Sequence, residues 1–203
     1  MDTEKIKKNL LDRGYAVTCF ATAGECAEYL NRSIDGTTVG IGGSVTVAQM
    51  NLLPMLEQHN TVYWHNDPKQ VSEFGAMAVR KNAIHTDIYI SSVNAMSEDG
   101  AIINIDYTGN RISTTAFGHS KVYLIVGKNK IEPDFEKALW RARNIAAPKN
   151  AQRVKSKTPC AVKGDRCYDC NSPERICRGF LVLERAMAGM ETEIVMVEEE
   201  LGY

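Results

Sequence analysis

The sequence TTVGIGGSVTVAQMNLLPML, which spans residues 37–56, contains two patterns joined by a pair of glycines. Residues 37–41 are rich in β-branched side chains and predict a strand. Gly42-Gly43-Ser44 ends that strand, and the apolar spacing of residues 45–56 predicts a helix. A strand, a glycine turn and a helix in this order are typical of α/β proteins, in which such units build a parallel sheet.

The rest of the chain continues this alternation of helices and strands. Helices are predicted at residues 2–14, after an N-cap at Thr22, at residues 68–81 and at residues 133–145. Strands are predicted at residues 15–21, 61–64, 87–93, 101–105, 121–126 and 193–197, whereas residues 180–183 suit either a helix or a strand. The turn sequence Ser97-Glu98-Asp99-Gly100 predicts a hairpin. This order of elements predicts an α/β sandwich with a mostly parallel sheet.

Length and charge restrict the class of protein. The 203 residues suit a single domain, and a hydrophobic content of 44% is enough for a sizeable core. The formal net charge of −1 gives no electrostatic preference for nucleic acid or for an anionic membrane. The first nine residues are charged, unlike a signal peptide, and no stretch reaches the roughly 18 apolar residues of a membrane span. We therefore expect a cytoplasmic protein with neither nucleic-acid nor membrane partners.

Four cysteines form a symmetric pattern near the C-terminus. The spacing C-x6-C-x2-C-x6-C is made by Cys160, Cys167, Cys170 and Cys177. Four thiolates are the ligand number of a tetrahedral zinc ion or of a [4Fe-4S] cluster. They lie in a segment, residues 146–179, that is mostly polar and lacks clear periodicity, so a metal is a natural organiser for it.

Two other interpretations of these cysteines stay open. Disulfides belong mainly to oxidising compartments, and unligated or redox-active thiols need no metal at all. The spacing does not distinguish zinc from a cluster, although six-residue spacers are longer than those of most zinc knuckles and favour the cluster slightly. Cys19 and Cys26 lie far away in the sequence and suit buried small hydrophobic side chains.

The glycine turn is the first candidate ligand site. Backbone N–H groups at a strand-to-helix turn favour an anion, and glycines permit close approach of a ligand to the backbone. The hydroxyl groups of Ser44 and Thr46 would add hydrogen-bond donors to Gly42 and Gly43. The same residues also suit an ordinary tight turn without a ligand.

The second candidate site follows the strand at residues 101–105. Asp106 suits a general base, Arg111 an anion clamp and Asn110 an orienting group. Upstream, Asn94 and Glu98 are positioned to face the same crevice at the carboxyl end of the sheet. A polar hairpin loop, with Arg111 paired to a nearby carboxylate, is the alternative.

The histidines carry no recognisable pattern. They are scattered through the chain without the spacing of a metal site, and each is expected at the surface or at a helix cap: His59, His65, His85 and His119.

Several of these motifs together resemble the LUD-domain family, formerly DUF162, which includes lactate-utilisation protein C. The resemblance rests on residues 93–100, 103–106, 109–111, 126–130, 143–148, 158–160, 169–173, 176–177 and 199–203, in that order along the chain. It spans essentially the whole chain.

This resemblance implies a three-layer sandwich like that of the NagB/RpiA/CoA-transferase superfamily, with the cysteine segment added at the C-terminus. Members of that superfamily bind phosphate, sugar or acyl ligands at the carboxyl ends of their strands. The resemblance implies that the first glycine turn of the superfamily corresponds to Gly42-Gly43-Ser44 in this chain. The family name derives from operons for lactate oxidation, in which these proteins act beside iron–sulfur partners. The resemblance assigns no reaction, because a fold alone does not determine one.

Two hypotheses follow for the function. In the first, a small anionic metabolite lies between residues 42–46 and residues 106–111, with Asp106 or Glu98 as the acid or base and Lys128 or Lys130 supplying positive charge. In the second, the cysteines hold an iron–sulfur cluster or zinc in a redox or partner subunit. Candidate partners are iron–sulfur proteins and further copies of the chain.

Overall fold

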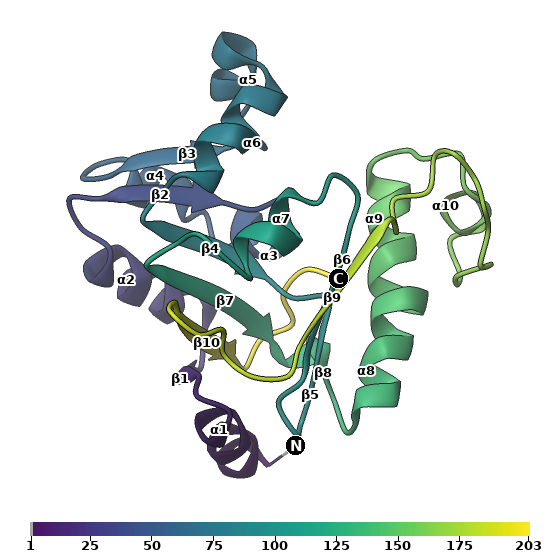
Figure 1. The fold of residues 1–203 in the computed structure, drawn as a ribbon, viewed down its shortest axis with the longest axis horizontal. Helices are drawn as coiled ribbons and strands as arrows, with labels where there is room; N and C mark the ends of the chain where they lie inside the picture. The colour runs from purple at the N-terminus through teal and green to yellow at the C-terminus, as the bar shows by residue number, and fades with distance from the viewer. Residues whose placement is uncertain (1) are drawn as a thin grey trace.

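The computed structural model describes residues 2–203, which form two sheets with helices packed against them (Figure 1). The larger sheet has six strands in the order β1-β10-β7-β4-β2-β3. Every neighbouring pair in it is parallel, which confirms the predicted α/β fold with a mostly parallel sheet. Its strands are β1 (Ala16–Phe20), β10 (Glu191–Val197), β7 (Lys121–Gly127), β4 (Ile88–Ser92), β2 (Thr38–Ile41) and β3 (Thr61–Trp64).

Both faces of the parallel sheet are covered by apolar side chains. One face packs against α2 (Ala23–Ser33), α3 (Val45–Gln49) and α4 (Leu53–Leu56). The other face packs against α1 (Thr3–Asp12), α6 (Ala76–Ile84) and the second sheet. Continuous apolar runs in the central strands are therefore buried on both sides, as expected for a parallel sheet.

The second sheet has the strand order β8-β5-β6-β9. It consists of β8 (Ile131–Glu132), β5 (Ala95–Ser97), β6 (Ile102–Asp106) and β9 (Gly179–Leu183). The β5–β6 pair is antiparallel, so the predicted hairpin is confirmed, and residues 179–183 form a strand rather than a helix. The strand that ends at Asp106 was expected to end near the carboxyl edge of the main sheet, but it belongs to this second sheet. The turn sequence of a hairpin determines that its two strands pair with each other. It does not determine which further strands pair with them.

Two predicted helices are each divided in the structure. Residues 45–56 form α3 and α4, separated by Asn51 with φ 50°. Residues 68–81 form α5 (Pro68–Phe74) and α6, separated by Gly75 with φ 79°. A positive φ is incompatible with a continuing right-handed helix, and glycine adopts it at little cost. By contrast, Thr22 caps α2 as predicted, in a capping box with Glu25.

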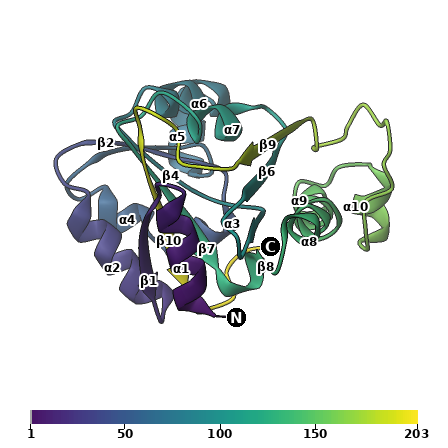
Figure 2. The same cartoon turned by 60° about the horizontal axis from the view of Figure 1, so that its bottom comes forward.

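A long helical column stands beside the second sheet, and the prediction that it ends near residue 145 was wrong. It consists of α8 (Phe135–Arg141), a π-helical turn η2 (Ala142–Ala146) and α9 (Ala147–Arg153). Pro148 has no N–H for a bond to residue 144, and the wider π turn directly precedes it. Figures 1 and 2 show that α10 (Pro159–Lys163) and the cysteine segment lie on the side of this column that faces away from the parallel sheet.

Two short helical elements, η1 (Lys128–Lys130) and α7 (Asn110–Thr114), and the tail that follows β10 complete the described chain. Within residues 2–203, no helix combines the length and the apolar character needed to cross a membrane.

Candidate functional site

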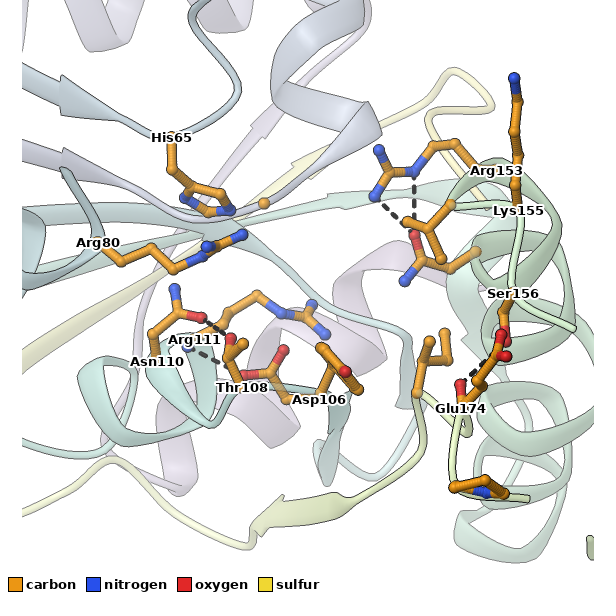
Figure 3. A pocket seen from close by; sticks show the side chains of 16 residues that line it. His65, Arg80, Asp106, Thr108, Asn110, Arg111, Arg153, Lys155, Ser156 and Glu174 are labelled. Atoms are coloured by element: carbon orange, nitrogen blue, oxygen red, sulfur yellow. Dashed lines mark hydrogen bonds between the residues drawn. The ribbon is translucent and has the colours of Figure 1, made fainter. Parts of the chain in front are cut away.

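A cleft lies between the parallel sheet and the helical column. Its outer part is a cavity of about 440 Å³. Its inner part, of about 50 Å³, shares four lining residues with the outer part, so the two form one continuous cleft: Gly43, Arg111, Asn150 and Arg153. Figure 3 shows His65 and Arg80 on one side, Arg153 on the other, and Asp106 and Arg111 between them.

Asp106 and Arg111 both line this cleft and are held together by a backbone hydrogen bond. The N–H of Arg111, at the start of α7, donates to Asp106 Oδ2 at 3.1 Å. The Arg111 guanidinium donates to Asn104 Oδ1 at 3.1 Å, Asn94 Oδ1 at 3.0 Å and the carbonyl oxygens of Ser92 and Ile105 at 3.3 and 2.6 Å. All of these acceptors are neutral, so they orient the cation without compensating its charge.

The structure separates two of the predicted residues from the cleft. Glu98 lies at the opposite end of the β5–β6 hairpin from Asp106, where its carbonyl oxygen accepts a hydrogen bond from Asn9 Nδ2 at 2.8 Å. Lys128 is exposed at the start of η1. Neither residue lines either part of the cleft, because strand direction and the η1 turn place them elsewhere. Asn110 lines the outer part.

The glycine turn contributes backbone to the cleft, and its side chains are used locally. The N–H of Gly42 donates to Ile90 O at 2.9 Å, and a Cβ at Gly42 would lie 2.8 Å from Ser91 Oγ. Gly43 lines the cleft, where a Cβ would lie 3.1 Å from His65 Nε2. Ser44 also lines the inner part, but its Oγ accepts from Val47 N at 3.2 Å and caps α3. Gly42 therefore serves packing between strands, and Gly43 keeps the cleft open.

Lys130 forms the floor of the inner part. Its Nζ donates to Thr46 Oγ1 and to Ser92 Oγ, both at 2.7 Å, and the side chain is buried. Burial, reinforced by the charges of Arg141 and Arg111, lowers the pKa of Lys130 to about 7. The sequence suggested Lys130 as a source of positive charge, and a pKa near 7 means that the buried amine gains or loses a proton near neutral pH.

Several cleft residues were not identified from the sequence. His65 was expected at the surface or at a cap, but it is half-buried and lines the cleft directly after β3. Burial and the nearby charge of Arg80 lower the pKa of His65 to about 4, so the ring is neutral at pH 7. Its position at the end of a predicted strand was the available signal. Arg80 and Arg153 lie on separate helices, and nothing in their local sequence indicates a site.

The charge of the cleft differs from that of the whole chain. Its basic lining residues are Arg80, Arg111, Lys130, Arg153 and Lys155, and its acidic lining residues are Asp106 and Glu174. Within residues 2–203, Arg80 Nε is buried and has no hydrogen-bond partner. A buried polar donor without an acceptor is uncommon in folded proteins. The cleft therefore combines an excess of cations with an unused donor, in a protein whose formal net charge is −1.

The four cysteines of the C-terminal pattern converge on a separate cavity of about 20 Å³. Its other lining residues are mostly apolar and include Ile105, Ala147, Pro148, Ile176 and Phe180. The four thiols are free, without disulfides among them. In the part of the chain from residue 2 to 203, no three His, Cys, Asp or Glu side chains are grouped closely enough to hold one ion. Metal binding therefore stays a prediction.

Comparison with known proteins identifies the family. The chain is similar in structure to a DUF162 family protein from Deinococcus radiodurans, with a TM-score of 0.51 and 12% sequence identity over 96% of this chain and 95% of that chain. No curated protein matches this sequence. At that identity the structural likeness shows the fold alone, but the family model of the LUD domain matches residues 3–197. Because this match covers nearly all of its length, the chain belongs to the LUD domain family.

Proposed function

We propose that the cleft binds a small anionic metabolite and acts on it by proton transfer. The observation that carries the proposal is the surplus of cations over carboxylates around one cavity, together with the unpartnered Nε of Arg80. Guanidinium groups bind carboxylate and phosphate oxygens through paired N–H donors, so an anion would satisfy what the protein leaves open.

Arg111 and Arg153 are suited to hold the anion. Arg111 is oriented by neutral acceptors on three segments, so it presents its charge with little freedom to move. Arg153 lies on α9 and lines both parts of the cleft. Its Nε and Nη2 donate to Asn150 Oδ1 at 3.0 and 2.9 Å, again a neutral acceptor.

Asp106 and Lys130 are suited to move a proton. Asp106 Oδ2 is fixed by the Arg111 N–H, and the carboxylate lines the outer part of the cleft. Lys130 lines the inner part, and its lowered pKa permits proton exchange near neutral pH. A short organic acid held by the arginines would lie between these two groups. This is the type of substrate that the family's association with lactate and organic-acid utilisation favours.

Ligand-induced stabilisation tests the proposal. We expect lactate, other short hydroxy acids, phosphosugars or acyl-CoAs to raise the melting temperature, because a ligand that binds only the folded state stabilises it. Arg80→Met should abolish the shift, whereas Arg32→Met, on the exposed surface of α2, should retain it. Absence of stabilisation by all three classes, hydroxy acids, phosphosugars and acyl-CoAs, at millimolar concentration would contradict the proposal.

A second candidate function is metal binding by the C-terminal segment, either as a redox centre or as a structural centre that engages iron–sulfur partner proteins. One observation favours it: all four cysteines line the same cavity although they come from α10, from the following loop and from the residues before β9. Metal analysis of protein purified without oxygen tests this function directly.

A further inference from the structure

The anion cleft and the cysteine cavity share a wall. Ile176 lines both cavities. Pro173 and Glu174 line the cleft, and they lie in the short segment between Cys170 and Cys177, both of which line the cysteine cavity. Residues 171–176, here called the wall segment, therefore connect two cysteines across one side of the cleft. A ligand that holds Cys170 and Cys177 in position would therefore also hold the wall segment between them.

The wall segment has little else to hold it. None of residues 161–180 is buried, so this part of the chain gains little from apolar packing. Its connections to the rest of the protein include Ser156 Oγ, which donates to Glu174 O at 2.9 Å, and Lys157 N, which donates to Glu174 Oε2 at 3.0 Å. Exposed hydrogen bonds of this kind contribute only about 1 kcal/mol each. A segment with so few buried contacts needs another source of order.

The surroundings of the cysteines suit thiolate ligands. Asp169 N donates to Cys167 Sγ at 3.4 Å, and Arg175 Nε donates to Cys177 Sγ at 3.3 Å. Donors to sulfur stabilise a metal-bound thiolate and orient it. Arg143 and Arg175 line the cavity and would offset negative charge.

The π turn of the helical column is anchored to the same region. Asn144 Oδ1 accepts from Cys167 N at 3.3 Å, and Arg143 Nη2 pairs with Asp169 Oδ1 at 2.9 Å. Both side chains come from η2, and π turns often occur at functional sites. The column therefore contributes two specific polar contacts to the cysteine loop, in addition to the apolar residues Ala147 and Pro148 that line the cavity.

The spacing of the cysteines favours a cluster over a single ion, because the six-residue spacers are longer than those of most zinc knuckles. Tetrahedral zinc with Zn–S bonds of about 2.3 Å would bring the sulfurs within about 4 Å of one another. In an iron–sulfur cube each thiolate binds a different iron, so the sulfurs surround the centre at larger separations. All four cysteines line one cavity, so four ligands are available to a single centre.

We propose that the four cysteines together bind one [4Fe-4S] cluster, and that this cluster holds the wall segment in place against the cleft. Each thiol releases its proton as it becomes an iron ligand. The predicted effect of the cluster on anion affinity rests on the proposed function of the cleft. The presence of the cluster does not depend on that function. An anion in the cleft would then bind tightly only while the cluster is present.

The first experiment measures the cluster. Protein purified without oxygen, or reconstituted with ferrous iron and sulfide, should contain about four irons and four sulfides per chain and absorb broadly near 400 nm. Cys170→Ser should lose most of this iron, and Cys19→Ser, which alters an exposed cysteine outside the segment, should retain it. One zinc per chain without iron, or neither metal after reconstitution, overturns the cluster.

The second experiment measures how firmly the wall segment is held, by amide hydrogen exchange. Amide hydrogen exchange in residues 171–176 should be slow in the loaded protein and rise at least about tenfold in Cys170→Ser, but not in Cys19→Ser. Wild-type protein stripped by chelator and oxidant gives the same comparison without a substitution that could impair folding. Unchanged exchange after loss of the cluster would overturn its role in holding the wall.

The third experiment links the two cavities, with inorganic phosphate as the probe. Its dissociation constant, measured by calorimetry, should rise about tenfold when the cluster is removed, which lies within the usual range of coupling between sites. Equal phosphate affinity with and without the cluster would overturn the coupling. If phosphate binds neither form while exchange still depends on the cluster, the anion cleft fails and the cluster with its wall stands.

Discussion

Asn94 holds Arg111 through a hydrogen bond from Nη2 to Oδ1 of 3.0 Å. The same Asn94 Oδ1 accepts from Ile105 N at 2.7 Å, and Asn94 N donates to Asn104 Oδ1 at 3.2 Å. A single asparagine thus connects the start of β5 to β6 and to the first turn of α7. The amide carries no charge, so its role can be separated experimentally from the electrostatic role of Arg111.

Asn94→Ala should weaken anion binding without changing the charge of the cleft. The guanidinium loses one of its orienting acceptors and Ile105 N loses its partner, and hydrogen bonds to charged groups contribute about 1.5 to 3 kcal/mol. We expect phosphate affinity to fall about tenfold or more, measured by calorimetry. Asn9→Ala removes an amide hydrogen bond at the other end of the hairpin and should leave affinity unchanged. Equal losses in both variants would mean that the effect is one of general stability.

Gly42→Ala should destabilise the fold because no room exists for a methyl group. A Cβ there would lie 2.8 Å from Ser91 Oγ and 2.9 Å from Tyr89 Oη, both on β4. Overpacking of this kind costs about 1 to 3 kcal/mol, measured by denaturant unfolding. Gly24→Ala is the matched control, since its Cβ would approach no atom closer than 3.9 Å and alanine favours a helix. A Gly42 variant as stable as the Gly24 variant would show that β2 and β4 adjust freely.

Local patterns predicted the parallel sheet well because each strand carries its own signal. Residues 37–41 and 121–126 gave strands close to those of the structure, and Thr22 caps α2 as expected. Helix breaks were missed where a single residue with positive φ, such as Gly75, interrupts a continuous apolar pattern. The second sheet was missed because a hairpin does not specify its neighbours.

The cleft was only partly predictable because several of its residues come from segments that are distant in the sequence. Asp106 and Arg111 are close in sequence, and the β5–β6 hairpin brings Asn94 beside them. Arg80 and Arg153 belong to α6 and α9, and only tertiary packing places both beside Gly43. The burial of Lys130 likewise depends on contacts with distant segments, including Thr46 and Ser92, which no local pattern records.

Lys130 should make stability depend on pH in the alkaline range. Its pKa is about 7 in the folded protein and near 10.5 in the unfolded chain, so the unfolded state binds more protons between these values. The free energy of unfolding should therefore rise with pH from about 7 to 10.5. Below pH 7 Lys130 is protonated in both states and should cause no change with pH. Urea unfolding of Lys130→Met between pH 6 and 10 should show a smaller slope than wild type. Lys128→Met, which alters an exposed lysine outside the cleft, should keep the wild-type slope.

His65 should impose a second pH dependence, at the acidic end. Its pKa is about 4 when folded against an ordinary value of 6.5, so the unfolded chain again binds more protons in that interval. Stability should fall as pH drops from 6.5 to 4, with a contribution of about 1 to 2 kcal/mol after allowance for partial exposure. His65→Gln should lose this part of the acid sensitivity, measured as the difference in melting temperature between pH 7 and pH 4.5. His85→Gln provides a histidine substitution outside the cleft and should behave as wild type. If both variants retain the full acid sensitivity, the imidazole of His65 is accessible to water and can accept a proton without cost to the fold.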